Sequence, residues 1–281
     1  MSDETPRSPS AMQAEFWDGE GGRRWAASQQ QLDAMLAPFA DAIFDAANLA
    51  SDEVVVDVGC GCGTTTLRAA RLVEPTCTGI DISRPMLEVA RRTAEGAGLD
   101  VTFLCADAAT HPFGDHSAHV VLSRFGTMFF DDPLAAFTNF RHWLRPGGRL
   151  VATVWNALEV NPWARALSDI IGRHVDLPRP PPGAPGPFAF GDAEAFAATL
   201  ERAGFENVEQ RALSIPMRVE GTADEVLQFF KERGPVTSAL EQLGDGPVYD
   251  AILRDLDTFV VEAYDGQGAS LDSSARLVVA T

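Results

Sequence analysis

Residues 53–64 read EVVVDVGCGCGT, a short β-branched run that ends in an acid and passes into three glycines at alternate positions. Such a run is typical of a buried strand. Gly59, Gly61 and Gly63 allow a tight turn with no Cβ in the way, and the threonines at 64–66 are expected to cap a helix whose N–H groups attract an anion. The stretch therefore predicts a strand–turn–helix floor for a nucleotide-type ligand.

The spacing of the glycines separates two classes of ligand. A dinucleotide-binding turn needs G-x-G-x-x-G, but the third-glycine position holds Thr64 when counted from Gly59 and Thr66 when counted from Gly61. The pattern D-x-G-x-G-x-G, which begins at Asp57, instead resembles the first motif of class I S-adenosylmethionine-dependent methyltransferases. For this motif alone, a glycine-rich turn without a ligand is the alternative.

Further motifs of that family follow in order along the chain. Residues 76–80 predict a second strand that ends at Asp81, and residues 100–108 contain a third that ends in Asp107. A carboxylate at the carboxyl edge of a sheet has enough acceptor sites to hold two ribose hydroxyls. The resemblance implies that Asp81 binds the ribose, and that Asp107 and the backbone N–H of Ala108 bind the adenine. For either acid, capping of the next helix is the alternative.

Residues 118–123 predict a fourth strand, and residues 144–150 predict the turn into a fifth. The whole set is similar to the group that includes the ubiquinone and menaquinone biosynthesis methyltransferases, most specifically over residues 53–155. It implies a doubly wound α/β fold, with a seven-stranded, mostly parallel Rossmann-like sheet and helical lid insertions. S-adenosylmethionine is the expected cofactor. The residues implied to bind it are Asp57, Gly59, Cys60, Gly61, Gly63, Asp81, Ile82, Met86, Asp107, Ala108, Ser123, Trp17 and Trp25.

The chain is expected to form one domain, because 281 residues with 46% hydrophobic content can fill one α/β core with insertions. The expected parts are an N-terminal helical lid (1–50), a cofactor-binding core (51–155), acceptor-side insertions (156–205 and 216–270) and final strands (206–215 and 274–281). Trp17 and Trp25 are assigned to the lid, and simple packing of an added helix is their alternative.

Helices are expected between and beyond these strands. Apolar periodicity and capping signals place them at 29–47, from Ser83 to Gly98, 132–144, 163–171, 192–203, near 222–233 and at 247–263. A further strand is expected over 205–213. The proline-rich segment 177–187 cannot be regular helix or sheet. We interpret it as a loop that covers the site, with an exposed linker or partner-binding stretch as the alternative.

The acceptor side is less specific, because methyl transfer by in-line displacement mainly requires alignment and exclusion of water. Arg124, Phe125 and Met128 follow the fourth strand where the methyl group would point, and Trp155 ends the fifth. These are the candidate substrate residues, with core packing and a paired surface charge as the equal alternative. If the acceptor is a hydroxyl, a base helps catalysis. Topology places only His174, among the five histidines, near both the carboxyl edge and the covering loop.

Composition narrows the possible partners. A net charge of −18 disfavours nucleic acid, whose binding needs a basic face. No charged leader and no run of 18 apolar residues is present, so a cytoplasmic protein without membrane insertion is expected. Four cysteines do not suggest disulfides, and no metal site is expected. The oligomeric state is left open.

The predicted function is methyl transfer from S-adenosylmethionine to a small-molecule acceptor, with oxygen ahead of carbon and nitrogen as the acceptor atom. Two alternatives stay open. One is a nicotinamide-dependent reductase, and the other is a noncatalytic module that binds S-adenosylmethionine, since fold does not imply function.

Overall fold

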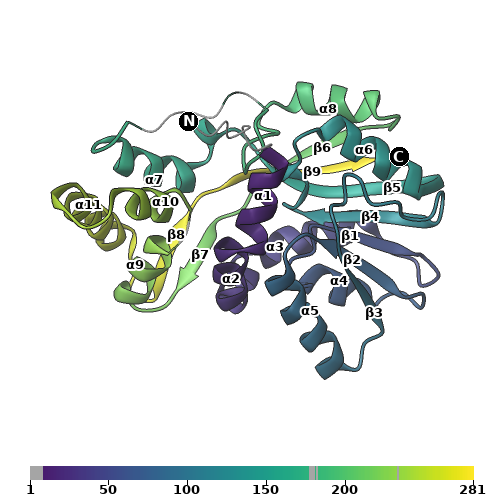
Figure 1. The fold of residues 1–281 in the computed structure, drawn as a ribbon, viewed down its shortest axis with the longest axis horizontal. Helices are drawn as coiled ribbons and strands as arrows, with labels where there is room; N and C mark the ends of the chain where they lie inside the picture. Colours follow the sequence, from purple (N-terminus) through teal and green to yellow (C-terminus); the bar gives the residue numbers. More distant parts are fainter. Residues whose placement is uncertain (1–8, 177–180, 182, 233) are drawn as a thin grey trace, which may run out of the picture.

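A seven-stranded sheet forms the centre of the computed structural model, which describes residues 9–176, 181, 183–232 and 234–281 (Figure 1). Its strands lie in the order β3-β2-β1-β4-β5-β9-β6. Their bounds are β1 Val55–Val58, β2 Cys77–Asp81, β3 Val101–Cys105, β4 Ala118–Arg124, β5 Leu144–Trp155, β6 Glu209–Ser214 and β9 Ser274–Ala280. Only β9 runs against its neighbours. The predicted doubly wound, mostly parallel sheet is confirmed.

Helices cover both faces of this sheet (Figure 1). One face carries α3 (Gln29–Ala47), α4 (Thr64–Ala69) and α5 (Arg84–Ala97), and the other carries α6 (Pro133–Trp143) and α8 (Ala193–Arg202). Successive strand residues point to opposite faces. Val56 and Val121 accordingly join the core beneath α6 and α8, whereas Val55 and Val120 join the core beneath α3.

The capping signals read from the sequence set the ends of two of these helices. Ser83 caps α5 by accepting a hydrogen bond from the N–H of Met86, and Gly98 ends the helix with left-handed dihedrals. Asp132 caps α6 by accepting a hydrogen bond from the N–H of Ala135. Both helices therefore begin directly after the loops that leave the carboxyl ends of β2 and β4.

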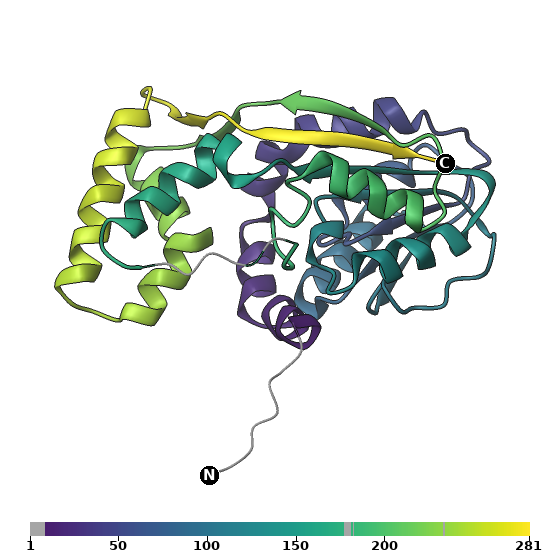
Figure 2. The same cartoon turned by 90° about the horizontal axis from the view of Figure 1, so that it is seen from above.

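A second group of elements lies beyond the carboxyl edge of the sheet, and we call it the second lobe (Figures 1 and 2). It consists of β7 Met217–Glu220, β8 Gly268–Leu271, α7 Pro162–Gly172, α9 Ala223–Lys231, α10 Gly234–Leu243 and α11 Pro247–Ala263. The lobe has an apolar core of its own, in which Ile171, Val226, Ile252 and Leu256 are fully buried. This core is separate from the three apolar clusters that cover the sheet.

Two long strands connect the lobe to the sheet. β6 leads into β7 across Pro216, and β8 leads into β9; β7 and β8 pair with each other as an antiparallel ribbon. The sequence analysis missed this ribbon and α10, and it started the sixth strand too early. β6 begins only at Glu209. The backbone N–H of Phe205 donates to the carbonyl of Leu200 at the end of α8, so Phe205 still belongs to the turn that ends this helix.

Two N-terminal helices stand between the sheet and the second lobe (Figure 2). These are α1 (Pro9–Asp18) and α2 (Glu20–Ala27). Asp18 accepts hydrogen bonds from the backbone N–H and the guanidinium of Arg84, at 2.9 and 2.6 Å, at the start of α5. Arg24 forms an ion pair with Glu241 of α10. The helices are thus tied to both halves of the molecule.

Candidate active site

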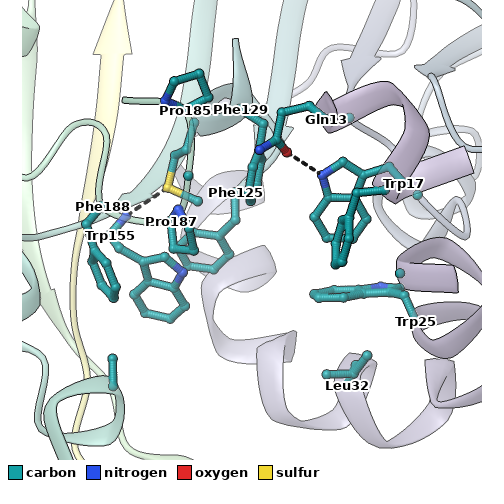
Figure 3. Close-up of a pocket in the computed structure, with 18 of the residues that line it drawn as sticks. Gln13, Trp17, Trp25, Leu32, Phe125, Phe129, Trp155, Pro185, Pro187 and Phe188 are labelled. Carbon is teal, nitrogen blue, oxygen red and sulfur yellow. Dashed lines mark hydrogen bonds between the residues drawn. The ribbon is translucent and has the colours of Figure 1, made fainter. Parts of the chain in front are cut away.

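A cavity of about 1670 Å³ opens at the carboxyl ends of β1, β2, β4 and β5 (Figure 3). Its walls come from the glycine turn, the N-terminal helices, α3 and the second lobe. Ligands of doubly wound sheets bind at this edge. A cavity for one drug-sized ligand measures about 300 to 1,000 Å³, so this cavity has room for more than one small molecule.

The glycine turn after β1 is held by a close approach of two backbones. Gly59, Gly61 and Gly63 all have positive φ, as the alternate spacing requires. A Cβ on Gly59 would lie 2.6 Å from the Cα of Gly126, which follows β4. Gly61 has a freer position, since a Cβ there would meet only the Met86 sulfur at 3.6 Å. The turn therefore leaves bare backbone facing the cavity.

The three threonines after the turn do not cap α4, contrary to expectation. Gly63 occupies the N-cap position, and the helix has no side-chain cap. The Thr65 and Thr66 hydroxyls instead donate to one oxygen of Asp57, at 2.6 Å each. Burial raises the pKa of Asp57, and the two hydroxyls oppose that shift. Asp57 thus supports the turn from beneath, where its side chain is only 1% exposed and does not line the cavity.

Asp81 ends β2 beside the glycine turn and does line the cavity. One carboxylate oxygen accepts a hydrogen bond from the N–H of Gly61 at 2.8 Å, and the other accepts one from Ser83 at 2.8 Å. Burial raises its pKa to about 6, and these backbone bonds oppose the shift. Each carboxylate oxygen has a second lone pair. Asp81 can therefore hold the turn and accept two ligand hydroxyls.

Asp107 and Ala108 lie in the cavity wall after β3. Asp107 accepts a hydrogen bond from the N–H of Ala109 at 2.9 Å, which closes a turn; no helix lies between β3 and β4, so the helix-capping alternative does not apply to this acid. Asn139 of α6 donates to the carbonyls of Ala108 and His111, at 2.9 and 3.0 Å. These hydrogen bonds fix the loop beside the site predicted for the adenine.

Two tryptophans of the N-terminal helices lean over the cavity (Figure 3). The rings of Trp17 and Trp25 meet edge to face at 5.9 Å, and Trp17 meets Phe129 in the same way at 5.3 Å. The indole N–H of Trp17 donates to Gln13. The two tryptophans thus show features of both alternatives, packing of an added helix and a lid over the site, because the rings pack on each other and still line the cavity.

The predicted substrate residues lie together on the far side of the glycine turn. Phe125 has a φ of 62°, which is rare for a bulky residue, and its ring stacks on Trp155 at 4.0 Å. The sulfur of Met128 accepts a hydrogen bond from the N–H of Trp155 (Figure 3). Arg124 pairs with Asp33 of α3 at 2.9 Å. All five side chains line the cavity.

Four of the predicted site residues do not line the cavity. Asp57 is one. Gly63 packs beneath the turn, where a Cβ would lie 2.9 Å from both Ala90 and Phe103. Ser123 is fully buried, and its hydroxyl donates to the carbonyl of Val58 and accepts from the N–H of Gly126. These three positions shape the turn, whereas the other predicted cofactor residues border the cavity.

The fourth, His174, lies two residues after the end of α7 and does not line the cavity. Its Nε2 is 3.0 Å from a carboxylate oxygen of Asp255 on α11, and its backbone N–H donates to the carbonyl of Ile171. This geometry supports a packing role between two helices and gives no support to a catalytic base. In the described part of the chain, no histidine, lysine or tyrosine lines the cavity.

The sequence analysis missed several residues that border the cavity. Trp163 and Phe188 extend the aromatic side, and Leu32 of α3 and Phe229 and Phe230 of α9 face it. Gly126 was missed too, although it follows the predicted fourth strand directly. Trp163 carried a weak signal, since Asn161-Pro162 begins a helix just after the fifth strand.

The described part of Pro181–Pro187 supports the interpretation of a covering loop. Pro185, Gly186 and Pro187 line the cavity, and the N–H of Gly186 bonds to the carbonyl of Met128 at 2.9 Å. Residues 177–180 and 182 of the predicted loop lie outside the described residues. The role of this segment in acceptor capture stays a prediction.

Neither a membrane span nor a metal cluster is found in the part of the chain that the structure describes. None of its helices has the length and apolar character needed to cross a membrane. No group of three or more His, Cys, Asp or Glu side chains is placed to hold a metal ion. All four cysteines are free.

Comparison with known proteins identifies the class to which this site belongs. Residues 55–148 match a family profile described as a methyltransferase domain. Phosphoethanolamine N-methyltransferase 1 of Arabidopsis thaliana is 31% identical over 161 residues, which cover 57% of this chain and 30% of that protein. The chain therefore spans less than a third of this relative.

Solved structures agree with the fold. The YcgJ protein of Bacillus subtilis superposes with a TM-score of 0.58 at 20% identity, over 86% of this chain and 96% of its own. Phosphoethanolamine N-methyltransferase 2 of Haemonchus contortus, solved with phosphomonomethylethanolamine and S-adenosylhomocysteine, gives a TM-score of 0.54 at 17% identity, over 99% of this chain and 58% of its own. The chain carries a class I S-adenosylmethionine-dependent methyltransferase domain, as its motifs predict. The finer likeness to the ubiquinone and menaquinone group stays a prediction.

Proposed function

We propose that the protein binds S-adenosylmethionine at the glycine turn and transfers its methyl group to a small molecule in the far half of the same cavity. The observation that carries this proposal is the continuity of the cavity. Its lining runs from Gly61 and Asp81, through Arg124, to the stacked rings of Phe125 and Trp155. A donor and an acceptor bound at these two ends would meet near the end of β4.

The residues at the first end fit this cofactor. Gly59 and Gly61 present backbone without side chains, Asp81 presents a carboxylate whose two oxygens keep free lone pairs, and Asp107 lies beside the expected adenine site. The bound donor supplies a methyl group on a positively charged sulfur. Aromatic faces attract cations, so Phe125 and Trp17 would favour the charge of this sulfur.

The chain contributes alignment and exclusion of water to the reaction. The described cavity lining contains carboxylates but no histidine, lysine or tyrosine, and the proposal assigns no general base. Holding two reactants about 3 to 3.5 Å apart in line can supply most of the acceleration. The half-buried tryptophans Trp17 and Trp25 and the Pro185–Phe188 segment cover the reacting atoms from bulk water.

Within this proposal, oxygen is our first choice for the acceptor atom, with carbon and nitrogen next. The Arabidopsis relative is named for methylation of a nitrogen, which supports keeping nitrogen in the set.

The proposal is tested in two steps. Calorimetric titration with S-adenosylhomocysteine and, separately, with NADH should show binding of the first and not of the second; the reverse would support the reductase. Incubation with methyl-labelled S-adenosylmethionine and a fractionated metabolite extract should then place the label in a low-mass product. Binding without any labelled product would favour the noncatalytic module.

A further inference from the structure

Four aromatic rings form a connected cluster along the far half of the cavity, and we call it the aromatic wall. It consists of Phe125, Trp155, Trp163 and Phe188. Phe125 and Trp155 stack at 4.0 Å, Trp155 and Trp163 are 5.5 Å apart, and Trp163 and Phe188 are 6.1 Å apart. The wall starts beside the end of β4, where the methyl group is expected, and reaches the Pro185–Phe188 segment (Figure 3).

The wall is fixed in place by a network of buried amide groups. Asn161 is fully buried and accepts hydrogen bonds from the indole N–H of Trp163 at 3.1 Å and from the N–H of Ser274 at 2.8 Å. Its own amide donates to the carbonyls of Asn156 and Ala157, at 2.8 and 3.1 Å. Every polar atom of the Asn161 side chain is therefore engaged, and the Trp163 ring is held in one orientation.

A second clamp holds the far end of the wall. Arg276 of β9 is buried and donates to the carbonyls of Phe190 and Gly191 and to the Asn156 side chain. Burial lowers the pKa of this guanidinium. The segment that carries Phe188 is thereby tied to the same junction between sheet and lobe as Trp163.

Further apolar side chains line the same cavity. They are Leu32 and Met35 of α3 and Val219 and Phe229 of the second lobe. The part of the cavity beside the wall and these side chains, which we call the slot, is therefore lined largely by apolar groups, although charged residues such as Asp33 and Glu232 also belong to the cavity lining. Such a slot favours a flat molecule, because rings stack best in offset or edge-to-face contact with rings.

The charges around this slot disfavour a phosphorylated acceptor. Of the arginines that line the cavity, Arg24 pairs with Glu241, Arg124 with Asp33, and Arg173 with Asp255. Arg165 lies exposed at the rim. Carboxylates outnumber arginines along the lining. Phosphate recognition needs converging cationic donors. Nη1 of Arg124 is buried without a hydrogen-bond partner, but one such nitrogen does not make a converging set for the phosphobase of the matched relatives.

We propose that the acceptor is a flat, uncharged and mostly apolar molecule with at least two fused or conjugated rings, and that it stacks along the aromatic wall. This inference rests on the proposed function. It sets this chain apart in acceptor chemistry from the phosphoethanolamine N-methyltransferases that it resembles in sequence. The acceptor atom would lie at the Phe125 end, next to the methyl donor.

The test uses Nile red, an uncharged fused-ring dye, as a probe for the slot. The full-length protein is saturated with S-adenosylhomocysteine and titrated with the dye, and the fluorescence increase gives a dissociation constant. We expect saturable binding at one dye per chain. Trp163→Ala and, separately, Phe188→Ala should weaken it at least about tenfold, whereas the dissociation constant of S-adenosylhomocysteine should stay within about twofold. Phosphoethanolamine at millimolar concentration should not displace the dye.

Phe113→Ala is the matched control, since this ring packs on Trp143 outside the cavity. It should leave dye binding unchanged, and a melting curve of each variant shows which of them are folded. If Trp163→Ala does not fold, the dye affinity of Phe188→Ala still tests the inference, because Phe188 is only partly buried. Displacement by phosphoethanolamine, or equal dye affinity in all folded variants, would overturn the inference. Failure to bind S-adenosylhomocysteine would instead contradict the proposed function.

Discussion

In the cofactor half of the cavity, the expected ligand contacts come from bare backbone and strand-end carboxylates between Gly59 and Ala108. In the acceptor half they come from the rings of the aromatic wall, which belong to the turn after β4, to β5, to α7 and to the segment before α8. The first half depends on backbone conformation, which a short stretch of sequence dictates. The second depends on how distant side chains meet, so it is free to vary while the first is kept.

The largest effect is expected where two backbones touch in the cofactor half. Gly59→Ala adds a Cβ that would lie 2.6 Å from the Cα of Gly126, at a φ of 65°. We expect affinity for S-adenosylhomocysteine to fall by about 100-fold or more, equivalent to about 2.7 kcal/mol, as measured by calorimetry. The cause is displacement of the turn, since backbone at this contact cannot shift without moving β1 or β4.

Gly98→Ala is the control for this change. Gly98 has nearly the same φ of 64°, but a Cβ there would meet nothing within 4 Å. It should therefore lower the free energy of unfolding by about 1 to 2 kcal/mol through backbone strain alone, with unchanged ligand affinity. If Gly59→Ala binds the ligand as tightly as Gly98→Ala does, the close approach of the two glycines is not what shapes the site.

The second prediction concerns Asp81, which holds the turn and faces the cavity. Asp81→Asn keeps the shape of the side chain but removes its charge and one acceptor oxygen. Hydrogen bonds to charged groups contribute about 1.5 to 3 kcal/mol each, so the dissociation constant of S-adenosylhomocysteine should rise at least about tenfold. Asp192→Asn is a matched control, because Asp192 accepts hydrogen bonds from two backbone N–H groups at the start of α8. An unchanged constant in folded Asp81→Asn would remove the ribose assignment.

Much of the cofactor half could be predicted from the sequence, because its signals are local. The strand before Asp57, the three glycines and the acid at the end of β2 lie where the pattern places them. The errors concern the direction in which side chains point. Asp57 and Ser123 were assigned to the ligand, yet strand alternation and the turn direct both side chains beneath the glycine turn, away from the cavity. A spacing of residues fixes neighbours along the chain but not the face that each one presents.

The acceptor half could be predicted only in part, for a different reason. Phe125 and Trp155 were found because the first directly follows β4 and the second ends β5, at the carboxyl edge of the sheet. Trp163 and Phe188 were missed, because their positions depend on the buried bonds of Asn161 and Arg276, which join segments more than 80 residues apart. The β7–β8 ribbon was missed as well, since its two strands are only four residues each.

A pH dependence of ligand binding follows from the raised pKa of Asp81. In the free protein this carboxyl has a pKa of about 6, because it is buried. Its ionised form is the one that accepts hydroxyl hydrogen bonds, so affinity for S-adenosylhomocysteine should be full above about pH 7 and decline below pH 6, approaching tenfold per unit. Folding stability depends on pH in the opposite direction. The raised pKa of Asp81 stabilises the folded free protein below the usual pKa of 3.8, and this stabilisation is lost as the pH rises through about 6. Calorimetry between pH 5 and 8 measures the first effect. Asp81→Asn should abolish it, and a flat profile in the unmodified protein would show that another group binds the ribose.

The smallest effect is expected at His174, which the sequence alone made the only candidate base. The imidazole is 3.0 Å from Asp255 and does not line the cavity. In His174→Ala, turnover of the labelled donor should stay within about twofold of the unmodified protein, with the same pH profile. The hydrogen bond from His174 lowers the pKa of Asp255, so its small contribution to stability is present above the usual pKa of that carboxyl and is lost as the pH falls through the lowered one.

Arg173→Ala provides the comparison, because Arg173 contacts the same carboxylate at 3.3 Å. The two variants should lower the melting temperature by similar, small amounts and leave the rate unchanged. A placed general base typically contributes about 10² to 10⁴ in rate. A loss of that size in His174→Ala, but not in Arg173→Ala, would mean that the imidazole leaves Asp255 and enters the cavity during the reaction. The acceptor half would then contain a general base, and the contrast between a cofactor half of backbone and carboxylates and an acceptor half of aromatic rings would no longer hold.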